Sequence, residues 1–200
     1  MTAGARPARP EQHGNVVPLR PAYGGVGTAH DPAHFDADAE HDELTGLLGN
    51  RPFQDSVRGA AQRRRGNENP WVGAATLEGL GDVVAEHGVE ARAQVLTIMA
   101  GRLSDSMREG DKLARIGESL FGLIVDAPTG DEAMAAFERM VTAVRRLAAK
   151  DRRWSDVRLT VGVAMLWGEE PYEAMARARD ALLRARERGG GMVMMSTALR

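Results

Sequence analysis

Residues 115–125 read RIGESLFGLIV and carry a clear signal for a strand that follows a tight turn. The run from Leu120 to Val125 is apolar and partly β-branched, which favours a buried central strand. Gly117 opens the turn, and we expect it to adopt a positive φ because it has no Cβ atom. Residues 112–116 supply the other strand of this hairpin, so the stretch predicts the middle of a sheet.

Apolar periods on either side of the hairpin predict an alternation of helices and strands. We expect helices over residues 50–65, 90–107, 132–149 and 173–188, a short helix or turn over 79–88, and strands over 71–77, 157–165 and 192–195. This order predicts a mixed α/β fold in which helices pack on one central sheet.

Composition separates a tail from a single domain. Residues 1–35 contain five prolines and no repeating apolar period, which predicts a disordered tail, and residues 36–200 then form the domain. The formal net charge is −2, so the charge does not favour nucleic acid as a partner. Without cysteines and without the roughly 20 apolar residues of a membrane span, we expect a cytoplasmic protein with no membrane partner.

Four blocks of residues resemble the GGDEF (diguanylate cyclase-type) domain family over residues 42–195. Residues 42–47 (DELTGL), with Arg51 and Phe53, are similar to its opening motif D-x-L-T-G-L-x-N-R-R-x-F. Residues 115–121 stand where R-[YI]-G-G-D-E-F is expected. Residues 160–164 (TVGVA) and 180–189 (DALLRARERG) are similar to its S-[IV]-G-[VI]-A strand and to its last motif.

The resemblance implies both a fold and an activity. The family fold is α+β, with a central mixed, mainly antiparallel sheet flanked by helices. Family members dimerise and join two GTP molecules into cyclic di-GMP. This phosphoryl transfer depends on carboxylates that bind Mg²⁺.

The residues at the catalytic positions depart from the family pattern. The signature becomes Gly117, Glu118, Ser119, Leu120 and Phe121, so the second glycine and the acidic pair are lost. Thr76 stands at a metal-binding Asp position, and Val84 and Ala93 replace an Asn that contacts guanine and a further Asp. Arg186 replaces a Lys and keeps a cation for phosphate. The resemblance therefore implies a degenerate domain with no catalytic residue, metal ligand or cofactor.

One binding site of the family is retained in register. Arg108 and Asp111 match the R-x-x-D site, at which family members bind cyclic di-GMP, and Arg139 stands where a second arginine contributes. Arginine presents a planar fork to phosphate oxygens or to a guanine edge, and aspartate accepts hydrogen bonds from guanine N–H groups. The alternative is that Arg108 and Asp111 form only a local ion pair or helix cap.

These residues leave three functional hypotheses open. The first is a catalytically inactive regulatory domain that binds cyclic di-GMP and signals as a homodimer or through a protein partner. The second is an interaction-only scaffold without nucleotide binding. The third is a cyclase with residual activity, in which Glu78 and Glu118 replace the lost carboxylates and Mg²⁺ is the cofactor.

Overall fold

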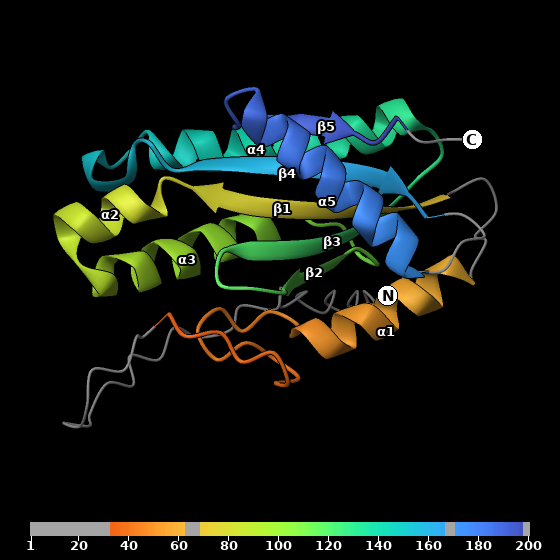
Figure 1. Ribbon diagram of the computed structural model, residues 1–200, viewed down its shortest axis with the longest axis horizontal. Helices are drawn as coiled ribbons and strands as arrows, with labels where there is room; N and C mark the ends of the chain where they lie inside the picture. Colours follow the sequence, from red (N-terminus) through yellow and green to blue (C-terminus); the bar gives the residue numbers. More distant parts are fainter. Residues whose placement is uncertain (1–32, 63–68, 167–170, 198–200) are drawn as a thin grey trace, which may run out of the picture.

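Helices and strands alternate along the chain, as the apolar pattern predicts (Figure 1). The computed structural model describes residues 33–62, 69–166 and 171–197. The helices are α1 (Asn50–Ala61), α2 (Leu80–His87), α3 (Val89–Ser104), α4 (Gly130–Ala148), a short 3₁₀ helix (Arg152–Trp154) and α5 (Pro171–Glu187). The strands are β1 (Asn69–Glu78), β2 (Lys112–Arg115), β3 (Leu120–Ala127), β4 (Arg158–Met165) and β5 (Val193–Met195). Among the described helices, none has the length and apolar character that crossing a membrane requires.

The strands form one sheet in the order β2-β3-β1-β4-β5. The central strand β1 pairs antiparallel with β3 and β4, and β2 pairs antiparallel with β3, whereas β4 and β5 are parallel. The mixed, mainly antiparallel sheet flanked by helices is therefore confirmed. Its central place explains why β1 is buried from Pro70 to Leu77.

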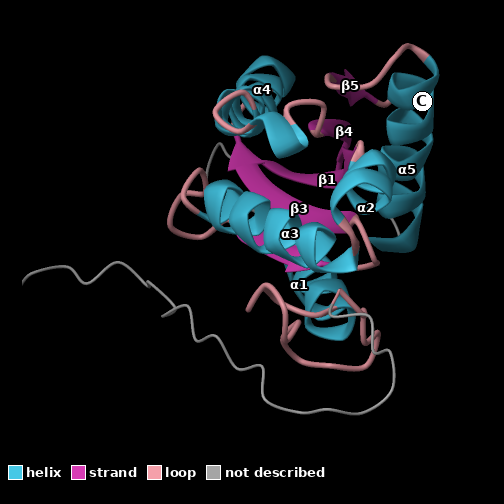
Figure 2. Cartoon of the chain, turned by 90° about the vertical axis from the view of Figure 1, so that its left-hand side faces the viewer, coloured by secondary structure: helices cyan, strands magenta, loops and turns pink. Residues whose placement is uncertain are grey.

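Alternate residues of β1 face two apolar layers, because successive side chains of a strand point to opposite sides. Val72 and Ala74 pack in a cluster with side chains of α1 and α5. Trp71 and Ala75 pack in a second cluster with side chains of α2, α3 and α4. Figure 2 shows the sheet between α5 and the pair α3 and α4.

Two glycines of the sheet allow α1 and α5 to lie close to the strands. A Cβ atom at Gly122 would lie 2.4 Å from the ring of Phe53, and one at Gly162 would lie 2.0 Å from the carbonyl oxygen of Ala178. Both distances are shorter than van der Waals contact. The side chain of Phe53 and the backbone of α5 therefore sit directly on the sheet.

The turn between β2 and β3 differs from the prediction made for Gly117. Positive φ values occur at Gly46, Gly79, Gly88, Gly110 and Gly189–Gly191 but not at Gly117, so that expectation is wrong. Residues 117–119 form a three-residue loop closed by a 2.8 Å hydrogen bond from the Ile116 N–H to the Leu120 carbonyl oxygen. This longer loop reverses the chain without a left-handed residue at Gly117.

The ends of the predicted segments differ from the structure by a few residues. Helix α3 ends at Ser104, whereas the apolar period predicts an end near residue 107. The predicted tail over residues 1–32 and the predicted helix end at residues 63–65 lie outside the described residues. Residues 33–35 are described, and the side chain of Ala33 is fully buried.

Candidate functional site

The tip of the β2–β3 hairpin meets the end of β1, which brings together the positions that hold metal in the family pattern. Thr76 is the register partner of Leu120 on β3 and of Thr160 on β4. The Thr76 hydroxyl donates a 3.1 Å hydrogen bond to the Ser119 carbonyl oxygen and lies 3.4 Å from the Ser119 hydroxyl. Two neutral hydroxyls and the apolar Leu120 therefore occupy these three positions.

Glu78, one of the two proposed substitute ligands, is engaged in a network of its own. Its carboxylate accepts a 2.6 Å hydrogen bond from the Thr160 hydroxyl and pairs with the Arg186 guanidinium at 3.1 Å. The Thr160 hydroxyl accepts in turn from the Gly191 N–H at 2.7 Å. Glu78 therefore ties β1 to β4 and to the end of α5, and the expected phosphate cation Arg186 is paired.

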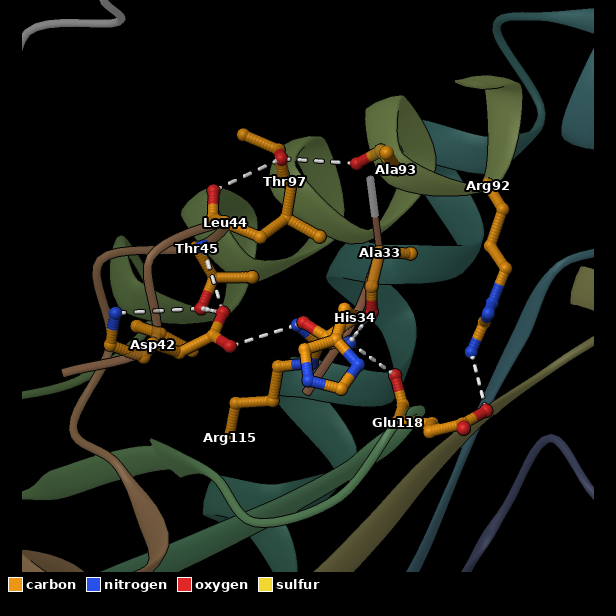
Figure 3. A network of polar contacts seen from close by, with 11 residues as sticks. Ala33, His34, Asp42, Leu44, Thr45, Arg92, Ala93, Thr97, Arg115 and Glu118 are labelled. Carbon is orange, nitrogen blue, oxygen red and sulfur yellow. Dashed lines mark hydrogen bonds and ion pairs between the residues drawn. The ribbon is translucent and has the colours of Figure 1, made fainter. Parts of the chain in front are cut away.

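Glu118, the other proposed substitute ligand, lies on the outer side of the hairpin tip. Its side chain is 75% exposed, and its carboxylate pairs with the Arg92 guanidinium of α3 at 2.9 Å (Figure 3). Across the described parts of the chain, no three His, Cys, Asp or Glu side chains converge on a point where they could hold a metal ion. The donor set at this site does not fit Mg²⁺, which prefers several oxygen ligands including carboxylates.

Apolar side chains occupy the two positions at which the family pattern has residues that read guanine. Val84 is a half-buried residue of α2, and Ala93 is a buried residue of α3. Neither side chain can donate or accept a hydrogen bond. The polar contact at Ala93 uses its backbone carbonyl, which accepts from the Thr97 hydroxyl at 3.0 Å.

A buried arginine anchors the hairpin tip to the segment before α1 (Figure 3). Arg115 is fully buried and donates to the Asp42 carboxylate at 2.8 Å, to the Ala33 carbonyl at 2.6 Å and to the Glu118 carbonyl at 2.8 Å. Asp42 also accepts from the Thr45 N–H and hydroxyl. Asp42 and Arg115 stand in two motifs that are 73 positions apart, and no signal in the sequence pairs them.

Arg108 and Asp111 lie in the loop between α3 and β2 and contact each other. The Asp111 carboxylate accepts a 2.8 Å hydrogen bond from the Arg108 N–H, and the Asp111 N–H donates to the Arg108 carbonyl at 3.1 Å. Burial raises the pKa of the Asp111 carboxyl, against the opposing effect of the Arg108 hydrogen bond and charge. A local turn that Asp111 caps is therefore present.

Arg108 and Arg139 meet at one small cavity of about 100 Å³. The cavity lies at the end of β3 and the start of α4, and Asp126 and Glu132 also line it. Asp111 does not line the cavity, although the charge of Asp126, which does, contributes to the raised pKa of Asp111. Sequence reasoning missed Asp126 and Glu132, because their place beside Arg108 depends on the pairing of β3 with β2.

Comparison with known proteins relates the chain to one family. The family model for "Diguanylate cyclase, GGDEF domain" matches residues 39–192, and no curated protein matches the chain. Diguanylate cyclase SiaD from Pseudomonas aeruginosa, solved with its activator SiaC, is 25% identical with a TM-score of 0.71, and the match covers 80% of this chain and 62% of SiaD. This chain thus spans less than two thirds of SiaD.

Two isolated GGDEF domains give matches over nearly their whole length. The GGDEF domain of DgcB from Caulobacter crescentus, solved in complex with c-di-GMP, is 21% identical with a TM-score of 0.71 over 82% of this chain and 100% of that chain. The GGDEF domain of FimX from Pseudomonas aeruginosa is 25% identical with a TM-score of 0.66 over 78% of this chain and 98% of that chain. Because the family model covers well over half of the chain, the protein belongs to the GGDEF domain family of diguanylate cyclases.

Proposed function

We propose that this GGDEF domain does not synthesise cyclic di-GMP but binds it, through Arg108, Asp111 and Arg139, as a regulatory module. The observation that carries the proposal is that Arg108 and Arg139, 31 positions apart in the chain (139 − 108), line one cavity. At about 100 Å³ this cavity takes one phosphate or one guanine edge, and the rest of the ligand lies outside it. The two guanidinium groups, with the Asp111 carboxylate in the adjoining loop, suit a ligand that combines phosphates with guanine edges. Cyclic di-GMP has both chemical features.

The donor set at the hairpin tip does not suit the synthesis of cyclic di-GMP. Thr76 and Ser119 bind each other, Leu120 is apolar, and Glu78 and Glu118 are each paired with an arginine. Phosphoryl transfer relies on positioned metal charge, since little covalent chemistry is left for the protein. A domain without the carboxylates for that metal would keep the fold and lose the reaction.

Comparison with relatives supports the choice of ligand and suggests a way of signalling. The DgcB domain was solved with c-di-GMP, and SiaD was solved with an activator protein. By analogy, the present domain would report cyclic di-GMP to a protein partner or to a second copy of itself. The proposal therefore includes either a protein partner or a homodimer.

One observation favours the scaffold hypothesis as the second candidate. Asp126 and Glu132 share the cavity with the two arginines, and Asp111 already accepts from the Arg108 backbone. Acidic neighbours oppose the binding of a ligand with two phosphates. An interaction-only domain would therefore keep this polar cluster as a structural cap without binding nucleotide.

Isothermal titration of the full chain with cyclic di-GMP decides between these candidates. We expect saturable heat for the wild type and a loss of about tenfold or more in affinity for Arg108→Ala and for Arg139→Ala, since each removes a charge-assisted contact. Arg146→Ala is the matched control, because Arg146 is an exposed arginine of α4 outside the cavity. No heat for the wild type, or equal affinity for all three variants, would leave the scaffold as the better explanation.

A further inference from the structure

A cavity of about 380 Å³ lies between α1 and α5, apart from the site described above. Its inner wall is formed by three buried apolar side chains, Phe53, Val57 and Ile116. Met175 and Ala176 of α5 line the facing wall. The volume falls within the range of about 300–1,000 Å³ in which proteins bind small organic molecules.

The packing of the two helices on the sheet explains why this space stays open. Gly122 lets the Phe53 ring sink onto β3, and Gly162 lets α5 approach β4 until backbone meets backbone. The residues of α5 that face the sheet here are Ala174 and Ala178, both fully buried. The small side chains of Ala174 and Ala178 on α5 and the Phe53 ring lying against β3 leave a gap between the helices that Met175 lines without filling.

Polar groups stand at the rim of the cavity above this apolar wall. Arg58 of α1 and Arg179 of α5 bring two guanidinium groups, and Tyr172 brings a ring that is 59% exposed. Arg58 is paired with Asp55. Arg179 is exposed and has no hydrogen bond or ion pair with any residue that the structure describes.

We infer that the cavity between α1 and α5 is a binding site for a small planar aromatic anion. The apolar wall accepts the flat body of the ligand, and Tyr172 offers a ring face or edge at the mouth. Arg179 supplies a charge-assisted hydrogen bond to a carboxylate, sulfonate or phosphate at the rim. Asn50 and Gln54, also in the lining, provide hydrogen-bonding groups that orient the ligand, whereas the Asp180 carboxylate opposes the anion and is outnumbered by the two guanidinium groups.

The site touches the signature hairpin although it is separate from the cyclic di-GMP cavity. Ile116 lines the cavity and directly precedes Gly117, and its N–H closes the three-residue loop of the hairpin. The lining residues of the two cavities are different. A ligand between α1 and α5 would therefore contact the base of the hairpin without competing for Arg108 or Arg139.

The probe for this site is 1-anilinonaphthalene-8-sulfonate, a flat aromatic anion whose fluorescence rises in apolar surroundings. The full chain is titrated as wild type, Arg179→Glu, Ala176→Trp and Arg188→Glu, and circular dichroism checks that each variant is folded. Ala176 is exposed on α5, so tryptophan there fills the cavity without removing a core contact. Arg188→Glu is the matched charge reversal, at an exposed arginine just after α5 and outside the cavity.

The inference predicts one saturable site for each chain. We expect Arg179→Glu to weaken the affinity about tenfold or more, Ala176→Trp to abolish the fluorescence rise, and Arg188→Glu to stay within about twofold of the wild type. Absence of saturable binding to the wild type overturns the site. Wild-type affinity in the Arg179→Glu variant overturns the anion assignment, and it decides the matter even if Ala176→Trp does not fold.

Discussion

Replacing Arg115 tests the buried ion pair that holds the signature hairpin to the segment before α1. The substitution Arg115→Met keeps most of the side-chain volume and removes the donors to Asp42, Ala33 and Glu118. Asp42 is 3% exposed and would remain as a buried carboxylate, supported only by Thr45 among the side-chain contacts that the structure describes. Breaking a buried pair on one side costs about 3–5 kcal/mol of unfolding free energy.

This loss is a large part of the roughly 5–15 kcal/mol that stabilises a typical domain. With a urea m-value of about 2 kcal/mol/M, the midpoint of unfolding should fall by about 2 M. The assay is urea unfolding followed by far-ultraviolet circular dichroism for the wild type, Arg115→Met, Asp42→Leu and the double variant. We expect the double variant to lose less than the sum of the single losses, by about 1–3 kcal/mol.

The control is Arg102→Ala, which removes an exposed pair with Asp105 at 4.0 Å. An exposed pair of this kind contributes about 0–1 kcal/mol. If Arg115→Met stays within about 1 kcal/mol of the wild type, or if the two single losses simply add, this ion pair does not hold the hairpin.

Three further predictions concern catalysis, titration and packing. Incubation with GTP and Mg²⁺ or Mn²⁺ should give no cyclic di-GMP by mass spectrometry, and formation of the product would restore the residual-cyclase hypothesis. Burial raises the pKa of Asp111 in the folded state, so the contribution of this carboxyl to stability is complete below pH about 3.8 and is lost as the pH rises through the raised pKa. Asp111→Asn should therefore become more stable relative to the wild type over that rise in pH. A difference in urea midpoints that does not change with pH would contradict this prediction. Gly162→Ala should destabilise the domain by about 3 kcal/mol or more, because its Cβ would lie 2.0 Å from the Ala178 carbonyl oxygen; an unchanged urea midpoint would show that α5 can shift away from β4.

The arrangement of elements and the proximity of Arg108 to Arg139 could be predicted from the sequence. The apolar run from Leu120 to Val125 predicts a strand in any context that buries both faces, and β3 is such a strand. The spacing of Arg108, Asp111 and Arg139 in the family pattern predicts one site, and the two arginines line one cavity. These features depend on periodicity and on the register of a shared fold.

Features that depend on tertiary contacts could not be predicted from the sequence. The φ of Gly117 follows from the length of the loop, which periodicity does not specify. Asp126 and Glu132 join the Arg108 cavity only once β3 is paired and α4 is packed. The ion pair between Glu78 and Arg186 joins β1 to the end of α5. The space between α1 and α5 depends on how closely Gly122 and Gly162 allow the two helices to pack on the sheet.

A crystal structure of the full chain grown with cyclic di-GMP would show directly whether the ligand binds at the Arg108 cavity. The ligand should lie between Arg108 and Arg139, with a phosphate or guanine within hydrogen-bond distance of both guanidinium groups. A second prediction of the same experiment is that Thr76 and Ser119 remain in contact with each other at the hairpin tip. Cyclic di-GMP bound beside Ser119 instead, or an Arg108 cavity free of ligand at saturating concentration, would rule out binding through Arg108 and Arg139.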